Sequence, residues 1–166
     1  MKDRVSAQEI VFFRFEKDFV ESGIRCIPMV VRFKLDACGI KLKLSEWNRL
    51  SSGQRMQMAY APCQSAAEVL IYREELCRMV TPLTGEIPAS IPVPDKPAWS
   101  RKDEIPYAIQ EKLQETSSAI EIGQWQQLTD LQRFALLKLS YPGHENKNFP
   151  KALAEFGIGV DNQCKL

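Results

Sequence analysis

The sequence predicts a mainly α-helical protein of two helical repeat units with pseudo-two-fold character, joined by a proline-rich connector and preceded by a short N-terminal extended arm. Three observations support this fold class. Residues 27–58 and 105–136 align without a gap at an offset of 78 positions, the separation between Ile27 and Ile105. Both copies restart a helix with the same N-terminal capping box. Residues 81–104 hold five of the ten prolines, too many for regular structure.

The repeat rests on residues that match in one register. Identical pairs include two Ile-Pro starts, two tryptophans and two Gln-Arg pairs: Ile27/Ile105, Pro28/Pro106, Lys34/Lys112, Leu35/Leu113, Trp47/Trp125, Leu50/Leu128, Gln54/Gln132 and Arg55/Arg133. Such a set rarely arises by chance. We therefore place the repeats at about residues 25–80 and 103–157 and the connector at about 81–102, all within a single domain of residues 1–166.

The N-terminal segment 11–20 sets Phe13, Phe15 and Phe19 among charged residues, which is compatible with a strand or an extended arm. We expect an arm that packs on the helices. A helix should then begin at Ile27-Pro28, because proline is tolerated in the first helical turn.

That first helix has one apolar face. Val31, Leu35 and Cys38 follow Ile27 at helical spacing, and Gly39 is a suitable C-terminal stop. The alternating segments 40–44 and 119–122 come next in the two copies. They predict either a short β-bridge between the copies or simple connectors to the tryptophan helices.

Capping boxes mark the helices that follow. Ser51 with Gln54, and Thr129 with Gln132, place a hydroxyl and an amide where they satisfy the first N–H groups of a helix. A third box begins at Ser65 and predicts a helix that Pro82 ends. Its counterpart should start near Pro150 and stop at Gly157.

Composition narrows the functional class. Twenty-two Lys and Arg stand against 21 Asp and Glu, a balance that argues against a general nucleic-acid binder. Residues 1–83 carry 13 basic and 10 acidic side chains, so the first repeat is the more basic half. The five cysteines lack CxxC spacing, and no secretion signal or long apolar stretch is present. We therefore expect reduced thiols, no metal site, no membrane association and a cytoplasmic location.

The most informative mismatch in the repeat lies just before each Ile-Pro pair. Arg25-Cys26 in the first copy stands where Asp103-Glu104 stands in the second. Acidic residues suit the positive end of a helix dipole, whereas a thiol beside an arginine at that end is a candidate nucleophile or ligand. The alternative is an inert, half-buried cysteine.

A basic run continues from this point along the first copy. Together with Arg25 and Cys26 it makes up the predicted partner-binding residues, namely Arg25, Cys26, Arg32, Lys34, Lys41 and Lys43. Such a run suits an acidic partner or a phosphate-bearing cofactor, and a solvated helix face is the alternative explanation. Trp47, Trp125, Arg55 and Arg133 are interpreted as scaffold. No catalytic triad, phosphate-binding loop or metal motif occurs, so no catalytic residue, metal ligand or bound cofactor is assigned.

Residues 13–50 (FRFEKDFVESGIRCIPMVVRFKLDACGIKLKLSEWNRL) resemble the nitrate reductase-associated protein family. The Phe-x-Phe-Glu-x-Asp-Phe opening, the Arg-Cys-Ile-Pro-Met run at residues 25–29 and Trp47 carry the likeness, which continues over most of the chain. The resemblance implies an accessory or maturation factor for assimilatory nitrate reductase, an enzyme that carries a molybdopterin cofactor and an iron–sulfur cluster. No functional residue is transferred by it.

The leading prediction is a non-enzymatic factor that binds the apo form of a molybdenum-dependent nitrate reductase or assists insertion of its cofactor. A first alternative is a cofactor-handling enzyme or carrier that uses Cys26. A second is a helix-turn-helix DNA-binding regulator, suggested by the closeness of the Trp47 and Gln54 helices. Near-neutral charge counts against that second alternative.

Overall fold

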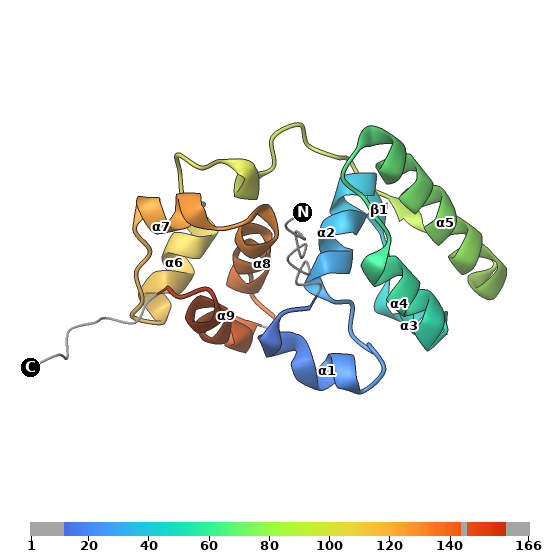
Figure 1. Cartoon of the computed structure of the whole chain (residues 1–166), viewed down its shortest axis with the longest axis horizontal. Coiled ribbons are helices and arrows are strands. Elements are labelled where there is room, and N and C mark those ends of the chain that lie inside the picture. The colour runs from blue at the N-terminus through green and yellow to red at the C-terminus, as the bar shows by residue number, and fades with distance from the viewer. Residues whose placement is uncertain (1–11, 144–145, 159–166) are drawn as a thin grey trace, which may run out of the picture. The chain divides into compact units, whose positions relative to one another are not determined.

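The computed structural model describes residues 12–143 and 146–158. Contacts along the chain divide it into two compact units, with the boundary between Ile91 and Pro92. Both units are mainly helical (Figure 1). The mainly α prediction is therefore confirmed, whereas the prediction of one domain stays a prediction.

Unit 1, up to Ile91, packs its helices around Trp47, whose indole is fully buried with Val31, Met58, Leu76 and Val80. Helix α2 contacts α4 and α5, and α3 also contacts α5. The elements in chain order are η1 (Arg14–Glu16), α1 (Lys17–Glu21), α2 (Met29–Cys38), β1 (Ile40–Lys41), α3 (Leu44–Arg49), α4 (Ser52–Tyr60), α5 (Ala66–Thr84) and β2 (Ala89–Ser90).

The predicted N-terminal extended arm is wrong for the residues that the structure describes. From Arg14 to Glu21 the chain is helical, first as η1 and then as α1. The Glu16 carboxylate accepts a hydrogen bond from the Phe13 backbone N–H at 3.2 Å, which starts the turn. Phe13 and Phe15 stack at 5.3 Å between ring centroids, so their alternation reflects a turn rather than a strand.

The alternating segment after α2 is a strand, but its partner is not the second copy. β1 pairs antiparallel with β2, with Ile40 opposite Ser90 and Lys41 opposite Ala89. A strand in the predicted connector therefore belongs to unit 1. Pro82 also fails to end α5, which continues to Thr84 before the left-handed Gly85. Only the last turn follows this proline, so few backbone hydrogen bonds are lost.

Unit 2, from Pro92, is built around α8. The fully buried side chains of Trp125, Ile109, Phe134, Leu136 and Phe149 form its core, and α8 contacts α6, α9 and both 3₁₀ turns. The elements are η2 (Ala98–Ser100), α6 (Tyr107–Glu115), α7 (Ile122–Gln127), α8 (Asp130–Ser140), η3 (Asn146–Asn148) and α9 (Phe149–Glu155).

Helix starts recur at the offset seen in the sequence. α6, α7 and α8 begin 78 positions after α2, α3 and α4. Ser51 and Thr129 each accept a hydrogen bond at 3.1 Å from the backbone N–H of the glutamine three residues later, which confirms both capping boxes. Pro28 and Pro106 are N-cap residues, so α2 and α6 each begin one residue later than the sequence predicted. Matching starts do not establish matching packing, so the two-unit repeat stays a prediction.

Candidate partner-binding site

Two residues that both copies of the repeat share, Trp47 and Arg55, hold the loop that carries Arg25 and Cys26 in unit 1. The Trp47 indole donates to the Ile24 carbonyl at 2.8 Å, and Arg55 Nη1 donates to the Gly23 carbonyl at 2.8 Å. Ile24 is buried and has a φ of 56°. This left-handed conformation is costly for a β-branched residue and requires the surrounding contacts to maintain it. The loop is therefore tied into one shape.

A buried carboxylate, not Cys26, lies at the N-terminus of α2. Glu16 is only 1% exposed, and its Oε1 accepts a hydrogen bond from the Met29 backbone N–H at 2.7 Å. This carboxylate supplies the negative charge that a helix N-terminus favours. Cys26 is half-buried and precedes the Pro28 N-cap by two residues. Glu16 therefore occupies one of the N–H groups at this helix end, and a role of Cys26 in binding or chemistry stays a prediction.

Sequence reasoning missed Glu16 because no local spacing joins it to a helix that begins 13 residues later. Its position among four phenylalanines is the one available signal, since a charged residue in an aromatic cluster is buried only when its polar atoms have partners.

Two of the predicted binding residues serve the fold. Arg32 Nε donates to the Ile27 carbonyl at 2.9 Å, which brings its guanidinium to the loop of Arg25. Lys34 Nζ donates to the Ala59 and Ala61 carbonyls, each at 2.7 Å, and lies 5.9 Å from the Tyr72 ring centroid. Lys34 thus stabilises the end of α4, and its ammonium is less suited to an external partner.

The remaining predicted residues are at the surface. Arg25 is exposed, and so are Lys41 in β1 and Lys43 at the N-cap of α3. Leu44 follows them with 51% of its side chain exposed. Arg32 bonds the carbonyl of Ile27 in the loop that carries Arg25, while Lys41 and Lys43 flank the buried Leu42. These residues of unit 1, namely Arg25, Arg32, Lys41, Lys43 and Leu44, are hereafter called the basic face.

The corresponding positions of unit 2 line an open depression of about 480 Å³. Its polar lining is Asp103, Glu104 and Gln110, and its apolar lining is Ile105, Leu113, Ala119, Ile120 and Ile122. At the 78-residue offset, Asp103 corresponds to Arg25, Gln110 to Arg32 and Ala119 to Lys41. Gln110 Nε2 donates to the Ile105 carbonyl at 2.7 Å, just as Arg32 bonds Ile27. Equivalent positions in the two units therefore differ in charge.

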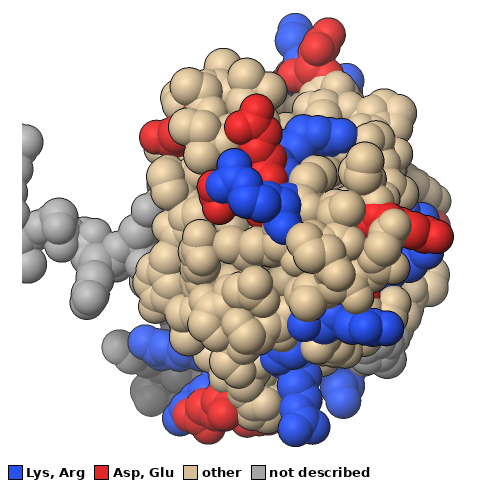
Figure 2. Space-filling view, turned by 90° about the vertical axis from the view of Figure 1, so that its right-hand side faces the viewer, with Lys and Arg blue, Asp and Glu red and all other residues tan. Residues whose placement is uncertain are grey.

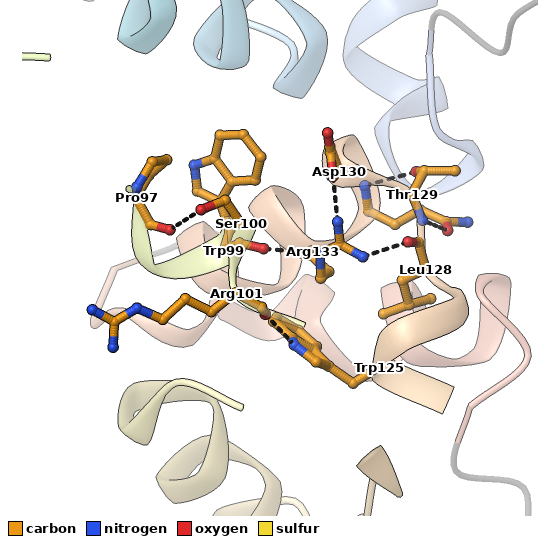
Figure 3. A network of polar contacts seen from close by, with 10 residues as sticks. Pro97, Trp99, Ser100, Arg101, Trp125, Leu128, Thr129, Asp130 and Arg133 are labelled. Atoms are coloured by element: carbon orange, nitrogen blue, oxygen red, sulfur yellow. Dashed lines mark hydrogen bonds and ion pairs between the residues drawn. The ribbon is translucent and has the colours of Figure 1, made fainter. Parts of the chain in front are cut away.

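The repeated tryptophans and arginines are scaffold, as predicted. Figure 3 shows the buried Arg133 guanidinium directed at three acceptors around it. It donates to the Trp99 carbonyl at 2.8 Å, to the Leu128 carbonyl at 2.6 Å and to the Asp130 carboxylate. The Trp125 indole donates to the Arg101 carbonyl at 2.8 Å. These bonds tie the segment before α6 to α7 and α8.

The described thiols of Cys26, Cys38, Cys63 and Cys77 are all free, as the sequence predicted. Burial raises the pKa of Cys38 to about 11, with the nearby Cys63 thiol adding to the effect. Burial also raises the pKa of Cys63. Both thiols therefore stay protonated at neutral pH and are poor nucleophiles.

Charge on the surface is mixed. On the side of the molecule where α5 lies, Lys and Arg side chains alternate with Asp and Glu and are separated by uncharged surface (Figure 2). No extended field of one sign is present on that side. Among the described residues, no group of three or more His, Cys, Asp or Glu side chains is placed to hold a metal ion.

Residues 12–156 match the model of a family described as conserved nitrate reductase-associated protein. The chain belongs to this family. The match spans both units, including the basic face and the depression. A search of curated proteins and a search of solved structures each gave no match.

Membership of the nitrate reductase-associated family agrees with an accessory role for the chain. In the part of the chain that the structure describes, no helix has both the length and the apolar character needed to cross a membrane.

Proposed function

We propose that this protein is a non-enzymatic cytoplasmic maturation factor that binds the apo form of a molybdenum-dependent assimilatory nitrate reductase through the basic face of unit 1. Membership of the nitrate reductase-associated family supports the identity of the partner. The basic face is the proposed binding surface because it combines exposed cations with an exposed apolar side chain. An acidic, partly apolar segment of the apoenzyme is the complementary ligand.

The observation that most supports this proposal is the fixed loop that precedes Arg25. The Trp47 and Arg55 hydrogen bonds hold the backbone of Gly23 and Ile24 before any partner arrives. A binding loop that is already ordered loses less conformational entropy on association. Arg32 bonds the same loop through Ile27 and extends the positive charge along α2.

We propose further that the bound factor keeps the apoenzyme open while its molybdopterin cofactor is inserted, and that the factor itself carries no cofactor. In this role the two units are copies of one helical module, of which unit 1 contacts the reductase. The matching helix starts and caps support common ancestry of the units.

Copurification of the factor with apo and holo reductase tests the proposal. The triple variant Arg25→Glu, Lys41→Glu, Lys43→Glu should lose the complex, because it reverses three exposed charges without removing a described hydrogen bond of the fold. Arg32 and Lys34 are left unchanged since both bind backbone carbonyls.

The matched control is Lys96→Glu, Lys102→Glu, Lys151→Glu, which makes the same change in net charge at exposed positions of unit 2. It should bind normally. Equal binding by both triple variants would show that the basic face is the wrong surface. Failure of the unaltered chain to bind either form of the reductase at low salt would reject the partner itself.

A further inference from the structure

A short extended segment of unit 1 pairs with the edge of β1, the strand that follows α2. Ala89 and Ser90 of β2 pair with β1, and the next residue, Ile91, donates its backbone N–H to the Gly39 carbonyl at 2.9 Å. Arg73 of α5 strengthens this arrangement, since its Nη1 donates to the Gly39 carbonyl at 3.0 Å and its Nη2 to the Ser90 hydroxyl at 2.7 Å. The chain thus supplies its own strand at this position.

The equivalent segment of unit 2, which follows α6, begins with the same left-handed backbone conformation. Gly39 ends α2 in the left-handed region with a φ of 71°, and Ser117, 78 positions later, follows α6 with a φ of 51°. A left-handed serine is uncommon. The next residues, 118–121, lead to α7 as residues 40–43 lead to α3.

This second edge lacks the strand that covers the first. Among residues 12–143 and 146–158, Ser118 and Ala119, which correspond to Ile40 and Lys41 of β1, belong to no strand. Ser118 and Ile120 are half-buried, whereas their equivalents in unit 1, Ile40 and Leu42, are buried. Uncovered backbone at a strand edge is a ready site for pairing with another chain.

The open depression lies beside this edge and offers side-chain recognition. Ile105, Leu113, Ile120 and Ile122 supply apolar surface, and Asp103 and Glu104 supply negative charge at its margin. Alternate side chains of an added strand point to one face, so a single apolar residue can enter such a depression while its neighbours meet the charged margin.

The charge around the depression selects a basic ligand. Glu121 is exposed next to the lining residue Ile122 and adds a third carboxylate. Arg101 forms an ion pair with Glu104 at 3.5 Å, but both side chains are more than half exposed. Such a surface pair contributes little. With Arg101 and the exposed Lys102 set against the three carboxylates, the margin keeps a net charge of −1, which favours a lysine or arginine of a partner.

We propose that this depression binds an extended, apolar segment of another protein that is flanked by Lys or Arg, and that the segment pairs with the edge at Ser118 and Ala119 as β2 pairs with β1. The site is separate from the basic face and selects the opposite charge. It does not depend on nitrate reductase being the partner, so either proposal can fail alone.

The test is a titration of the full-length, ¹⁵N-labelled chain with the synthetic peptide Lys-Ile-Ala-Ser-Ile-Lys, followed by NMR. Amide signals of residues 117–122 should shift with the Lys-flanked peptide and stay in place with the Glu-flanked version of the same peptide. The double variant Asp103→Lys, Glu104→Lys should bind the Lys-flanked peptide roughly tenfold more weakly. The control Glu86→Lys, Asp95→Lys makes the same charge change at two exposed positions outside the depression and should bind normally.

Three outcomes would overturn the inference. The first is the absence of peptide-dependent shifts at residues 117–122, or equal binding by both double variants. The second is a concentration-dependent shift of these signals without peptide, lost in Asp103→Lys, Glu104→Lys, which would identify a second copy of the chain as the occupant. The third is a shift of the same signals when the chain is shortened to end at Ile158, which would assign the depression to the chain's own last residues.

Discussion

Replacing Arg133 should destabilise unit 2 far more than replacing Arg55 destabilises unit 1, although the two arginines hold matching positions in the repeat. Arg133→Met keeps the apolar stem and removes the guanidinium. The Trp99 and Leu128 carbonyls then lose a donor at 2.8 and 2.6 Å, at a site where the arginine was 1% exposed. An unsatisfied buried acceptor costs about 1–3 kcal/mol, so two of them predict a loss of roughly 2–6 kcal/mol.

Arg55→Met removes an equal number of hydrogen bonds, to the Gly23, Trp47 and Asn48 carbonyls. The guanidinium is only half-buried there, so water can replace it. The expected loss is about 1 kcal/mol. Residue type, number of bonds and position in the repeat are held constant, and the two sites differ in burial and in the exposed Asp130 carboxylate that Arg133 also contacts.

Hydrogen exchange followed by mass spectrometry measures the two units separately and avoids treating the whole chain as a two-state system. Peptides from α8 should lose protection strongly in Arg133→Met, and peptides from α4 should lose little in Arg55→Met. Equal losses, or a loss below about 1 kcal/mol for Arg133→Met, would refute the view that burial of these bonds sets their energetic weight.

Four further predictions concern the fold. Glu16→Ala should lower the free energy of unfolding of unit 1 by roughly 1–3 kcal/mol, because it leaves buried backbone N–H groups unpaired; unchanged exchange protection of α2 would contradict this. Ser117→Gly should raise the stability of unit 2 by about 0.5–1 kcal/mol, since glycine accepts the left-handed conformation without steric cost; a lower urea midpoint for unit 2 would contradict it. Cys38 has a folded pKa above its unfolded value, so its contribution is complete below pH 9.0 and is lost as the pH rises toward about 11, by at most about 2.7 kcal/mol. Urea unfolding should therefore show a smaller loss between pH 8 and 10.5 for Cys38→Ala than for the unaltered chain, and a thiol reagent at pH 8 should label Cys26 before Cys38 or Cys63, as read by peptide mapping.

Local signals in the sequence predicted local structure well. The capping boxes at Ser51, Ser65 and Thr129 place helix starts correctly because donor and acceptor lie three residues apart. The scaffold role of Trp47 and Trp125 followed from their size and their place in the repeat. Such features depend on residues that are neighbours in the chain, so their pattern is visible without a structure.

Contacts between distant residues were not predictable in the same way. The pairing of β1 with residues 89 and 90 links positions that are nearly fifty residues apart, and proline density around β2 suggested no regular structure. Glu16 bonds the first residue of α2 across the short helix α1 and the loop at residues 22–28. Arg32 and Lys34 looked like surface charges until their carbonyl partners were placed. For the candidate site, the sequence therefore identified the basic residues but not which of them the fold itself uses.

The left-handed Ile24 has a consequence for how binding and folding are connected. Its backbone is kept in a costly conformation by the Trp47 and Arg55 side chains, so Arg25 takes up its displayed position only when the core of unit 1 has formed. A ligand that requires Arg25 in that position binds the folded unit and not the unfolded chain, and must stabilise unit 1 by mass action. Occupancy by a partner and the lifetime of unit 1 should therefore rise together, so the conformation of this loop reports whether unit 1 is folded.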